Sequence, residues 1–538
     1  MSATATSGER ERKQLVARAG VVGAGTLLSR VLGLFRDIAL AALFDREATD
    51  AWWVAFTIPN ALRSLLGEGA VTSAVVPVLT AKLEREGDEA AKLFFARVRG
   101  ASLVALALVT AGGMVFARPL TELFATGYHD RPGEFDRTVE LTRIVFPYIF
   151  FMGTAALGMA ALNANRRFAV AAFAPGLLNV ALVGAAVAAP WLSSGDPVRA
   201  LAYGALVGGV LQVVAQWPAL RRIGYASPPS FVFDPDVREV LRRIAPLMFG
   251  IGIYYVDLVL SRRLLSELGT GAQSYFSWAM RLCDFPQGIF VMALSTAALP
   301  SLSALAARGE RAELARTWAH GMSLAMFVAV PASVAMVVLG EPIVVAVFQR
   351  GAFDAAASHE TARALLWQGG AIWTVAAVRQ TVPALYALGD TRTPVIVSGI
   401  DLCAFIALAL GLRGSMGHVG ISVAVAGSSA VQMVLLLVGL RRRLGTIEGR
   451  ALSASVGRTM AASLLAGVAG WGAAQVLVFP GLPSGFGRMV PGLGGMAAFT
   501  VVFFLAALGL RAPELEEIVR AFRRRLSRGA KRSGSPSV

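Results

Sequence analysis

The 538-residue sequence has little charge and almost no cysteine, and each shortage excludes a class of protein. Only 16% of the residues are charged, whereas 56% are hydrophobic and the mean hydropathy is +0.62. Soluble domains are about a quarter charged, so we expect an integral membrane protein. The two cysteines, Cys283 and Cys403, both lie in apolar stretches, which excludes a disulfide framework and a cysteine-ligated metal cluster.

Motifs of soluble catalysis are also missing. The four histidines are scattered and have no spacing typical of metal ligands. The sequence contains no H-E-x-x-H motif, no Walker A loop and no G-x-S-x-G motif. We therefore expect no cofactor, no ATP hydrolysis and no enzyme activity.

The sequence contains many long apolar runs. A helix of roughly 20 apolar residues crosses about 30 Å of hydrocarbon, and about fourteen stretches are long enough. This predicts an all-α polytopic membrane protein. The predicted spans are 17–44, 50–80, 93–117, 138–163, 168–190, 199–220, 244–266, 272–305, 315–339, 357–388, 394–412, 417–440, 452–477 and 489–510.

The basic residues are unevenly placed. A soluble protein with a net charge of +16 would be expected to bind nucleic acid. Here most Lys and Arg fall in alternate loops and in both tails, so the positive-inside rule predicts that both termini are cytoplasmic. We expect contact with anionic membrane lipids and no nucleic acid partner.

One polar connector near the middle, Arg221 to Arg243, separates two groups of six spans. A short echo between Thr72–Leu79 and Ser295–Leu302 is typical of transporters built from repeats. The predicted regions are an N-terminal cytoplasmic tail (1–16), a six-helix lobe (17–222), a cytoplasmic linker (223–243), a second six-helix lobe (244–443), two terminal helices (444–510) and a basic cytoplasmic tail (511–538).

Ionisable residues interrupt the first apolar run, in the segment Ser29–Asp37. A charged side chain at the bilayer centre costs at least about 2.5 kcal/mol and normally faces a wet cavity. Arg30 and Asp37 are seven residues apart, as are Ser29 and Arg36, so each pair lies along one helical line. Gly33 lies between them as a candidate hinge. The first span is therefore predicted to line an aqueous chamber.

Further charges fall in other spans. The second span carries Pro59, Arg63 and Glu68, and the eighth carries Arg281 and Asp284. Arginines on three helices indicate a surplus of positive charge and an anionic cargo. A guanidinium fork suits a diphosphate better than lysine does. The alternative is that these arginines only hold helices together through Asp37, Asp50, Glu68 and Asp284.

Several stretches of the sequence match one family in order along nearly the whole chain. They are Ser29–Asp37, Thr49–Asn60, Leu162–Phe168, Phe173–Asn179, Arg350–Asp354, Ala384–Pro394 and Gly417–Gly420. On these residues the chain resembles the MviN/MurJ family of lipid II flippases, within the multidrug/oligosaccharidyl-lipid/polysaccharide exporter superfamily.

The resemblance implies two six-helix lobes around a central cavity and a lipid groove formed by the last two helices. It implies movement of lipid II, the undecaprenyl-diphosphate-linked peptidoglycan precursor, from the inner to the outer leaflet of the bacterial cytoplasmic membrane, in cell-wall biogenesis. We expect a monomer that works by alternating access. The implied substrate-binding residues are Ser29, Arg30, Arg36, Arg63 and Arg281, the implied acids are Asp37, Asp50 and Glu68, and we add Asp284 as a charge partner and Gly33 and Pro59 as hinges.

The sequence also departs from the family pattern. Thr57 and Ser64 stand where a basic residue is common. Asp257 is a candidate sodium ligand, but the positions of its family partners, near Phe405 and Ala409, are apolar, so coupling to sodium or to the membrane potential stays open. The alternatives are another exporter of the superfamily, carrying a different polyprenyl-linked glycan or a drug, or a non-transporting cell-wall scaffold.

Overall fold

A computed structural model describes residues 7–63, 72–192, 195–288, 292–478, 484–517 and 520 of the chain. In this part of the chain all regular structure is helical. The first helices are α1 (Ser7–Leu43), α2 (Arg46–Arg63), α3 (Thr72–Arg85), α4 (Asp88–Val115), α5 (Ala117–Ala125), the 3-10 helix η2 (Thr126–Asp130), α6 (Glu134–Val145), α7 (Tyr148–Ala164), α8 (Phe168–Phe173), α9 (Gly176–Leu192), α10 (Arg199–Arg222) and α11 (Pro235–Ser266). The remaining helices are α12 (Ala272–Pro286), α13 (Met292–Ala307), α14 (Arg311–Val338), α15 (Gly340–Phe348), α16 (Ala355–Gly370), α17 (Ile372–Ala387), α18 (Arg392–Met416), α19 (His418–Leu444), α20 (Gly449–Val476), α21 (Ser484–Gly487) and α22 (Met489–Gly509). The predicted all-α class is confirmed.

Each predicted span falls on one of these helices or on two consecutive ones. Nine helical segments of the described residues are long and apolar enough to cross a membrane. The other predicted spans coincide with helices that carry interior charge or are divided in two, such as α2 with α3 and α12 with α13. The element order is consistent with fourteen spans, and that number stays a prediction.

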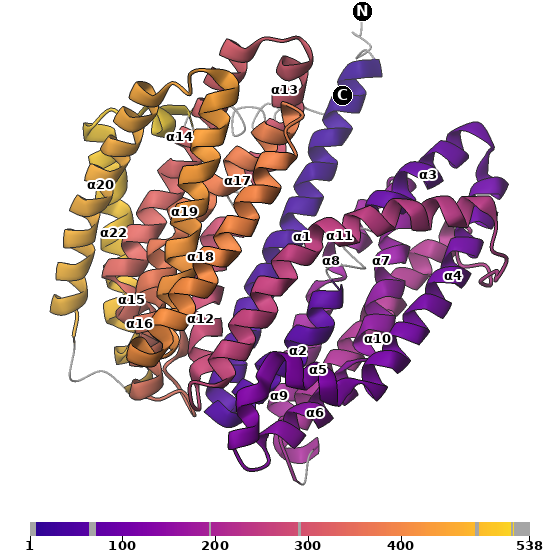
Figure 1. Cartoon of the computed structure of the whole chain (residues 1–538), viewed down its shortest axis with the longest axis horizontal. Coiled ribbons are helices and arrows are strands. Elements are labelled where there is room, and N and C mark those ends of the chain that lie inside the picture. The colour runs from indigo at the N-terminus through magenta and orange to yellow at the C-terminus, as the bar shows by residue number, and fades with distance from the viewer. Residues whose placement is uncertain are drawn as a thin grey trace, which may run out of the picture. The chain divides into compact units, whose positions relative to one another are not determined.

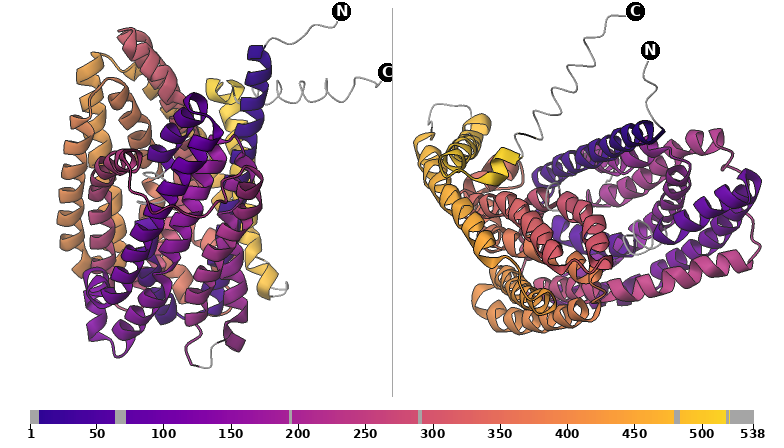
Figure 2. Two further views of the ribbon diagram at one scale, coloured as in Figure 1. Left: turned by 90° about the vertical axis from the view of Figure 1, so that its right-hand side faces the viewer. Right: turned by 90° about the horizontal axis from the view of Figure 1, so that it is seen from above.

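The first helix is longer than the first predicted span. α1 begins at Ser7, ten residues before the predicted start, and continues unbroken for 37 residues (Figures 1 and 2). At 1.5 Å per residue it is about 55 Å long, well beyond the ~30 Å that hydrocarbon requires. The basic residues at its start therefore extend past the apolar part of the helix.

The chain divides into two compact units, residues 1–274 and 275–538. The order of elements is similar in both. A 28-residue helix, α4 or α14, is followed at once by a nine-residue helix, α5 or α15. In the first unit η2, α6, α7, α8, α9 and α10 then follow, and in the second α16, α17, α18 and α19. This recurrence supports an internal duplication, and the lobe boundaries named above stay predictions.

The core of the first unit pairs large aromatic side chains with small residues. Trp52 and Phe56 stack at 4.9 Å between ring centroids, and Tyr148 packs against Phe56. In the same core, α9 and α10 approach closely, since a Cβ at Gly204 would overlap the Cβ of Ala185. Apolar burial and this tight packing hold α2, α7, α9 and α10 together.

The connector between α10 and α11 is bound to α4. The Ser230 amide donates to the Ala96 carbonyl at 2.9 Å, and a Cβ at Gly100 would overlap the Ser230 carbonyl oxygen. Asp234 forms an ion pair with Arg97 and accepts from the Val237 amide at the start of α11. Burial raises the pKa of Asp234, but these two partners outweigh it and the net pKa lies below its usual value. The charged caps therefore fix where α11 begins.

In the second unit, α20 and α22 lie side by side (Figures 1 and 2). A Cβ at Gly470 would lie 2.9 Å from the Gly495 carbonyl oxygen, and one at Gly495 would lie 3.0 Å from the Gly470 carbonyl oxygen. Only glycine permits this approach of two helix backbones. The outer sides of both helices expose large apolar residues, among them Leu465, Val468, Trp471, Leu505 and Leu508.

Candidate functional site

Arg36 and Asp37, both predicted as site residues, are buried side by side on α1. The Arg36 Nε and Nη2 atoms donate to the Asp37 Oδ1 atom at 2.9 and 2.7 Å. The third contact is with α9, where Arg36 Nη1 donates to the Asn179 Oδ1 atom at 3.0 Å. A buried guanidinium is tolerated when it is paired and hydrogen-bonded in this way. This pairing agrees with the structural alternative for Arg36, and the role of Arg36 in binding stays a prediction.

The contact between α1 and α9 is close on either side of this pair. The Asn179 Nδ2 atom donates to the Ser29 carbonyl oxygen at 2.9 Å. A Cβ at Gly176 would lie 3.2 Å from Leu32, and one at Gly33 would lie 3.8 Å from the Asn179 amide. Ser29 and Arg30 are half-buried about two turns before Arg36. The packing thus brings Ser29, Gly33 and Arg36 around one α9 side chain.

The structure describes only some of the other predicted site residues. Arg63 is the last residue of α2, and its side chain lies outside the described residues, as does all of Glu68. Arg281 and Asp284 are on α12 in the second unit, with Arg281 Nη1 3.8 Å from Asp284 Oδ2. Both side chains are at least one-third exposed. Convergence of the four arginines on one chamber stays a prediction.

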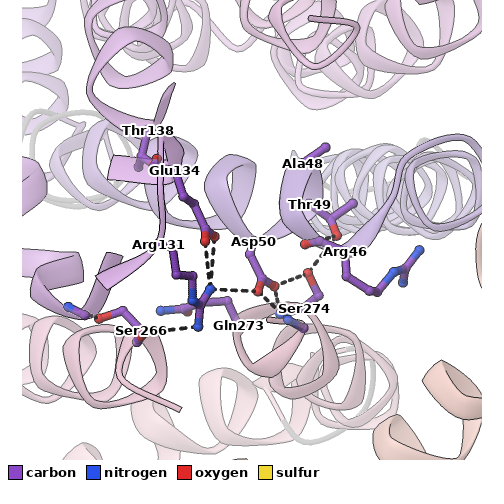
Figure 3. A network of polar contacts seen from close by, with 12 residues as sticks. Arg46, Ala48, Thr49, Asp50, Arg131, Glu134, Thr138, Ser266, Gln273 and Ser274 are labelled. Atoms are coloured by element: carbon purple, nitrogen blue, oxygen red, sulfur yellow. Dashed lines mark hydrogen bonds and ion pairs between the residues drawn. The ribbon is translucent and has the colours of Figure 1, made fainter. Parts of the chain in front are cut away.

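Asp50 lies at the centre of a second buried network, shown in Figure 3. Its side chain is fully buried, near the start of α2. It accepts from the Gly271 amide at 2.6 Å, from the Ser274 amide at 2.9 Å and from the Ser274 hydroxyl at 2.6 Å. Ser274 Oγ also lies 2.8 Å from Thr49 Oγ1. Asp50 therefore caps the start of α12, where a carboxylate satisfies free amides and complements the helix dipole.

Arg131 extends this network to the turn before α6. Its Nη1 atom is 3.0 Å from Glu134 Oε2 and 3.9 Å from Asp50 Oδ2, and its Nη2 atom donates to the Ser266 carbonyl at 3.3 Å (Figure 3). Asp50 and Glu134 are both buried, so Arg131 offsets two buried carboxylates. Asp50 thus connects the first turn of α12 to α2, and Arg131 connects Asp50 to α6 and to the end of α11.

Two site predictions concern hinges and sodium. Pro59 lies inside α2, which continues four residues beyond it, and Gly33 lies inside the unbroken α1. Asp257 is half-buried on α11, and its carbonyl accepts from the Ser261 hydroxyl. Within the described ranges, no group of three His, Cys, Asp or Glu residues could hold a metal ion. The roles of all three residues stay predictions.

With this geometry in place, comparison with known proteins is informative. The family model "Lipid II flippase MurJ" matches residues 40–484. A lipid II flippase MurJ of Burkholderia cenocepacia is 34% identical over 432 residues, which are 78% of this chain and 82% of that protein. A probable lipid II flippase MurJ of Rhizobium meliloti is 32% identical over 523 residues, which are 95% of this chain and 96% of that protein.

The chain belongs to the MurJ family. Its fold is also found in a solved structure titled "Lipid II flippase MurJ, inward closed conformation", with a TM-score of 0.73, 22% identity and coverage of 91% of this chain and 99% of that one. An inward-facing multidrug resistance MATE family transporter of the MOP superfamily matches with a TM-score of 0.64 at 14% identity, over 78% of this chain and 96% of that one. At these identities the likeness is one of fold.

Membership of the MurJ family makes this chain a multi-pass protein of the bacterial inner membrane, in a family of transporters. The predicted fold class and family are therefore confirmed. The orientation of the termini and the oligomeric state stay predictions.

Several MurJ family motifs contain helix-capping residues. In Ala384–Pro394, Asp390 accepts from the Thr393 amide at 2.9 Å and pairs with Arg443 Nε at 2.7 Å. Burial raises the pKa of Asp390, but these bonds outweigh it and lower the net pKa. In Arg350–Asp354, Asp354 accepts from the Ala357 amide at the start of α16. These motifs could be recognised from the sequence, but not their contacts.

Other residues of the two networks were not predicted from the sequence. They are Asn179, Arg131, Glu134, Gly271 and Ser274. Asn179 closes the motif Phe173–Asn179, which was a usable signal. Arg131 and Glu134 lie just before the predicted fourth span. Charged residues are expected in a loop, so these two were not recognised as site residues.

Proposed function

We propose that this chain is a flippase that moves lipid II from the inner to the outer leaflet of the cytoplasmic membrane by alternating access. The observation that carries the proposal is the family match over residues 40–484, which includes the end of α1 and all of α2 with its capping Asp50. The segment Ser29–Asp37 precedes that match and adds a buried arginine on a membrane helix. An anionic diphosphate is the cargo that such guanidinium groups suit.

The headgroup site consists of Arg30, Arg36, Arg63 and Arg281, with Ser29. Their guanidinium groups replace the water around the diphosphate once it leaves the cytoplasm. Asp37 and Asp284 hold neighbouring arginines in place, as the contacts of Arg36 with Asp37 and of Arg281 with Asp284 suggest. Glu68 completes the set of embedded acids.

Asp50 is the gate residue of the proposal. If both termini are cytoplasmic, the start of α2 lies at the outer surface of the membrane, because α1 crosses from inside to outside. The capping bonds from Gly271 and Ser274 then hold that end closed. Opening requires these bonds to break, while Gly33 and Pro59 absorb the bending of α1 and α2.

The prenyl tail stays in the bilayer, along the exposed apolar sides of α20 and α22. Both termini are cytoplasmic and the working unit is a monomer. Moving one charge through 100 mV is worth about 2.3 kcal/mol, so the membrane potential is a sufficient bias for an anionic cargo or for the return step. Sodium bound at Asp257 is the alternative source.

The test is translocation of fluorescent lipid II by the purified chain in vesicles. We expect loss of translocation, and loss of complementation in a flippase-depleted bacterium, for Arg30→Ala and Arg281→Ala with normal membrane insertion. Arg316→Ala is the matched control, since Arg316 is exposed on α14 and forms an ion pair with Glu313, one turn back on the same helix. Full activity of the Arg30 and Arg281 variants would contradict the site. Transport of a different glycan or of a drug instead of lipid II would favour another exporter of the superfamily.

A further inference from the structure

The motif Phe173–Asn179 ends in a residue whose place in the structure suggests a specific role. Asn179 lies in the first turn of α9 and is 6% exposed. Its side chain uses both of its polar atoms on α1: Oδ1 accepts from Arg36 Nη1, and Nδ2 donates to the Ser29 carbonyl oxygen. One buried carboxamide thus contacts two residues of the proposed headgroup site.

The contacts of Arg36 show what Asn179 adds. Asp37 binds Nε and Nη2, on one edge of the guanidinium plane, and Asn179 binds Nη1. A guanidinium held through all three nitrogens has a fixed plane, and loss of the contact at Nη1 removes one of these restraints. Recognition of a diphosphate by a planar fork depends on that orientation.

Charge explains why a neutral residue is useful at this position. Arg36 and Asp37 together carry no net charge. A carboxylate at position 179 would accept from Arg36 as well, but it would add a negative charge beside the bound anion and would repel it. It would also face the Ser29 carbonyl oxygen without a hydrogen to donate. Leucine, of similar size, would offer neither bond.

We propose that Asn179 is a positioning residue of the headgroup site: it sets the plane of the Arg36 guanidinium and adds no negative charge beside it. The inference rests on the proposed function, in which Arg36 binds the diphosphate. It predicts that the affinities of Asn179 variants for the headgroup do not follow the order of their melting temperatures.

The experiment compares Asn179→Leu and Asn179→Asp in the purified full chain. Fluorescent lipid II is the first probe and undecaprenyl diphosphate, which lacks the sugars, is the second. We expect about tenfold weaker binding of both probes by Asn179→Leu, as for loss of one hydrogen bond to a charged group. Asn179→Asp should weaken binding further, although it keeps the bond to Arg36 and should melt at or above the temperature of Asn179→Leu.

A double variant tests whether Asn179 acts through Arg36. In an Arg36→Lys background, which removes the fork, Asn179→Leu should change the affinity by less than about twofold further. Leu182→Ala is the packing control: Leu182 is fully buried on α9 and should lower the melting temperature without changing affinity.

Affinities of the two Asn179 variants that follow their melting temperatures, or affinities equal to that of the parent chain, would overturn the inference. So would a full additional loss in the Arg36→Lys background. If the parent chain binds neither probe, the proposed function itself fails and this inference fails with it. If the parent binds and Arg36→Lys does not, while the Asn179 variants are normal, only the role of Asn179 is wrong.

Discussion

Two connections in different units share a glycine with positive φ and differ in chemistry. In the first, Arg131 and Gly133 lie between η2 and α6, and Phe135 and Asp136 are in the first turn of α6; in the second, Arg350, Gly351, Phe353 and Asp354 lie between α15 and α16. Both glycines have positive φ, 78° at Gly133 and 56° at Gly351. Both phenylalanines are buried.

The arginines differ in what they contact. Arg131 pairs with Glu134, lies near Asp50 and donates to the Ser266 carbonyl, so it connects several elements. Arg350 donates to the carbonyl of Ala346, one turn back on α15. The glycine with positive φ recurs in both connections and needs no partner on another element. A buried ionic network needs partners on other elements. Arg131 has such partners, whereas Arg350 contacts the end of the helix just before it.

The largest expected difference in stability comes from replacing each of the two arginines separately. Arg131→Ala leaves the buried Glu134 carboxylate without its ion-pair partner, which should cost about 3 kcal/mol of stability. Arg350→Ala should cost less than about 1 kcal/mol. Thermal unfolding of the two purified variants checks this, and similar losses would show that the two turns are equivalent after all.

The capping aspartates offer a second comparison. Asp50→Asn keeps one acceptor but turns an N–H toward the amides of α12, leaving a buried donor unpaired at a cost of about 2 kcal/mol. Asp354→Asn, at the exposed residue before α16, should cost about 0.5 kcal/mol because Asn also caps helices well. Complementation should fail or weaken for the first variant only. Equal growth of both strains would count against a gate at Asp50.

Acid should affect the charged caps of both units in the same direction. The pKa values of Asp234 and Asp390 lie below the usual range, because partner hydrogen bonds outweigh burial. Each group therefore stabilises the fold above the unfolded pKa of about 3.9 and loses this contribution as pH falls through the lower folded pKa. Asp390→Asn should be about 1 kcal/mol less stable at pH 7, and the difference from the parent chain should shrink below about pH 4. A difference that persists in full as the pH falls through the lower folded pKa would contradict the assignment.

The smallest difference between the two turns is expected at their glycines. Gly133→Ala and Gly351→Ala each place a Cβ on a left-handed residue, at a cost of roughly 1 kcal/mol. Melting temperatures of the two variants should fall by the same amount. A much larger fall for one glycine would show that the turns differ in backbone as well as in charge.

Much of the fold was predictable because long apolar runs mark helices without reference to any other part of the chain. The predicted spans coincide with helices over the residues that the structure describes, and the position of Arg36 and Asp37 on α1 followed from the sequence. The nine-residue helices α5 and α15 were missed because each is too short to be recognised as a span.

The contacts of the site residues could not be predicted in the same way. Asn179 is 143 residues from Arg36, and Ser274 is 224 residues from Asp50. Such pairs depend on which helices pack together and in what rotation, and periodicity within one helix carries no information about that. The motifs indicated that Asp50 and Asn179 matter, but only the helix packing shows which residues they contact.

The close approach of Gly470 and Gly495 has a consequence for the movement of a polyprenyl lipid. With carbonyl oxygens of each helix within 3.0 Å of where the other's Cβ would be, no methylene group fits between α20 and α22 at this level. In the proposed mechanism, the prenyl tail would therefore pass along the outer surface of this pair and not between the two helices. Alanine at either position would push the two helices apart and change the shape of that surface.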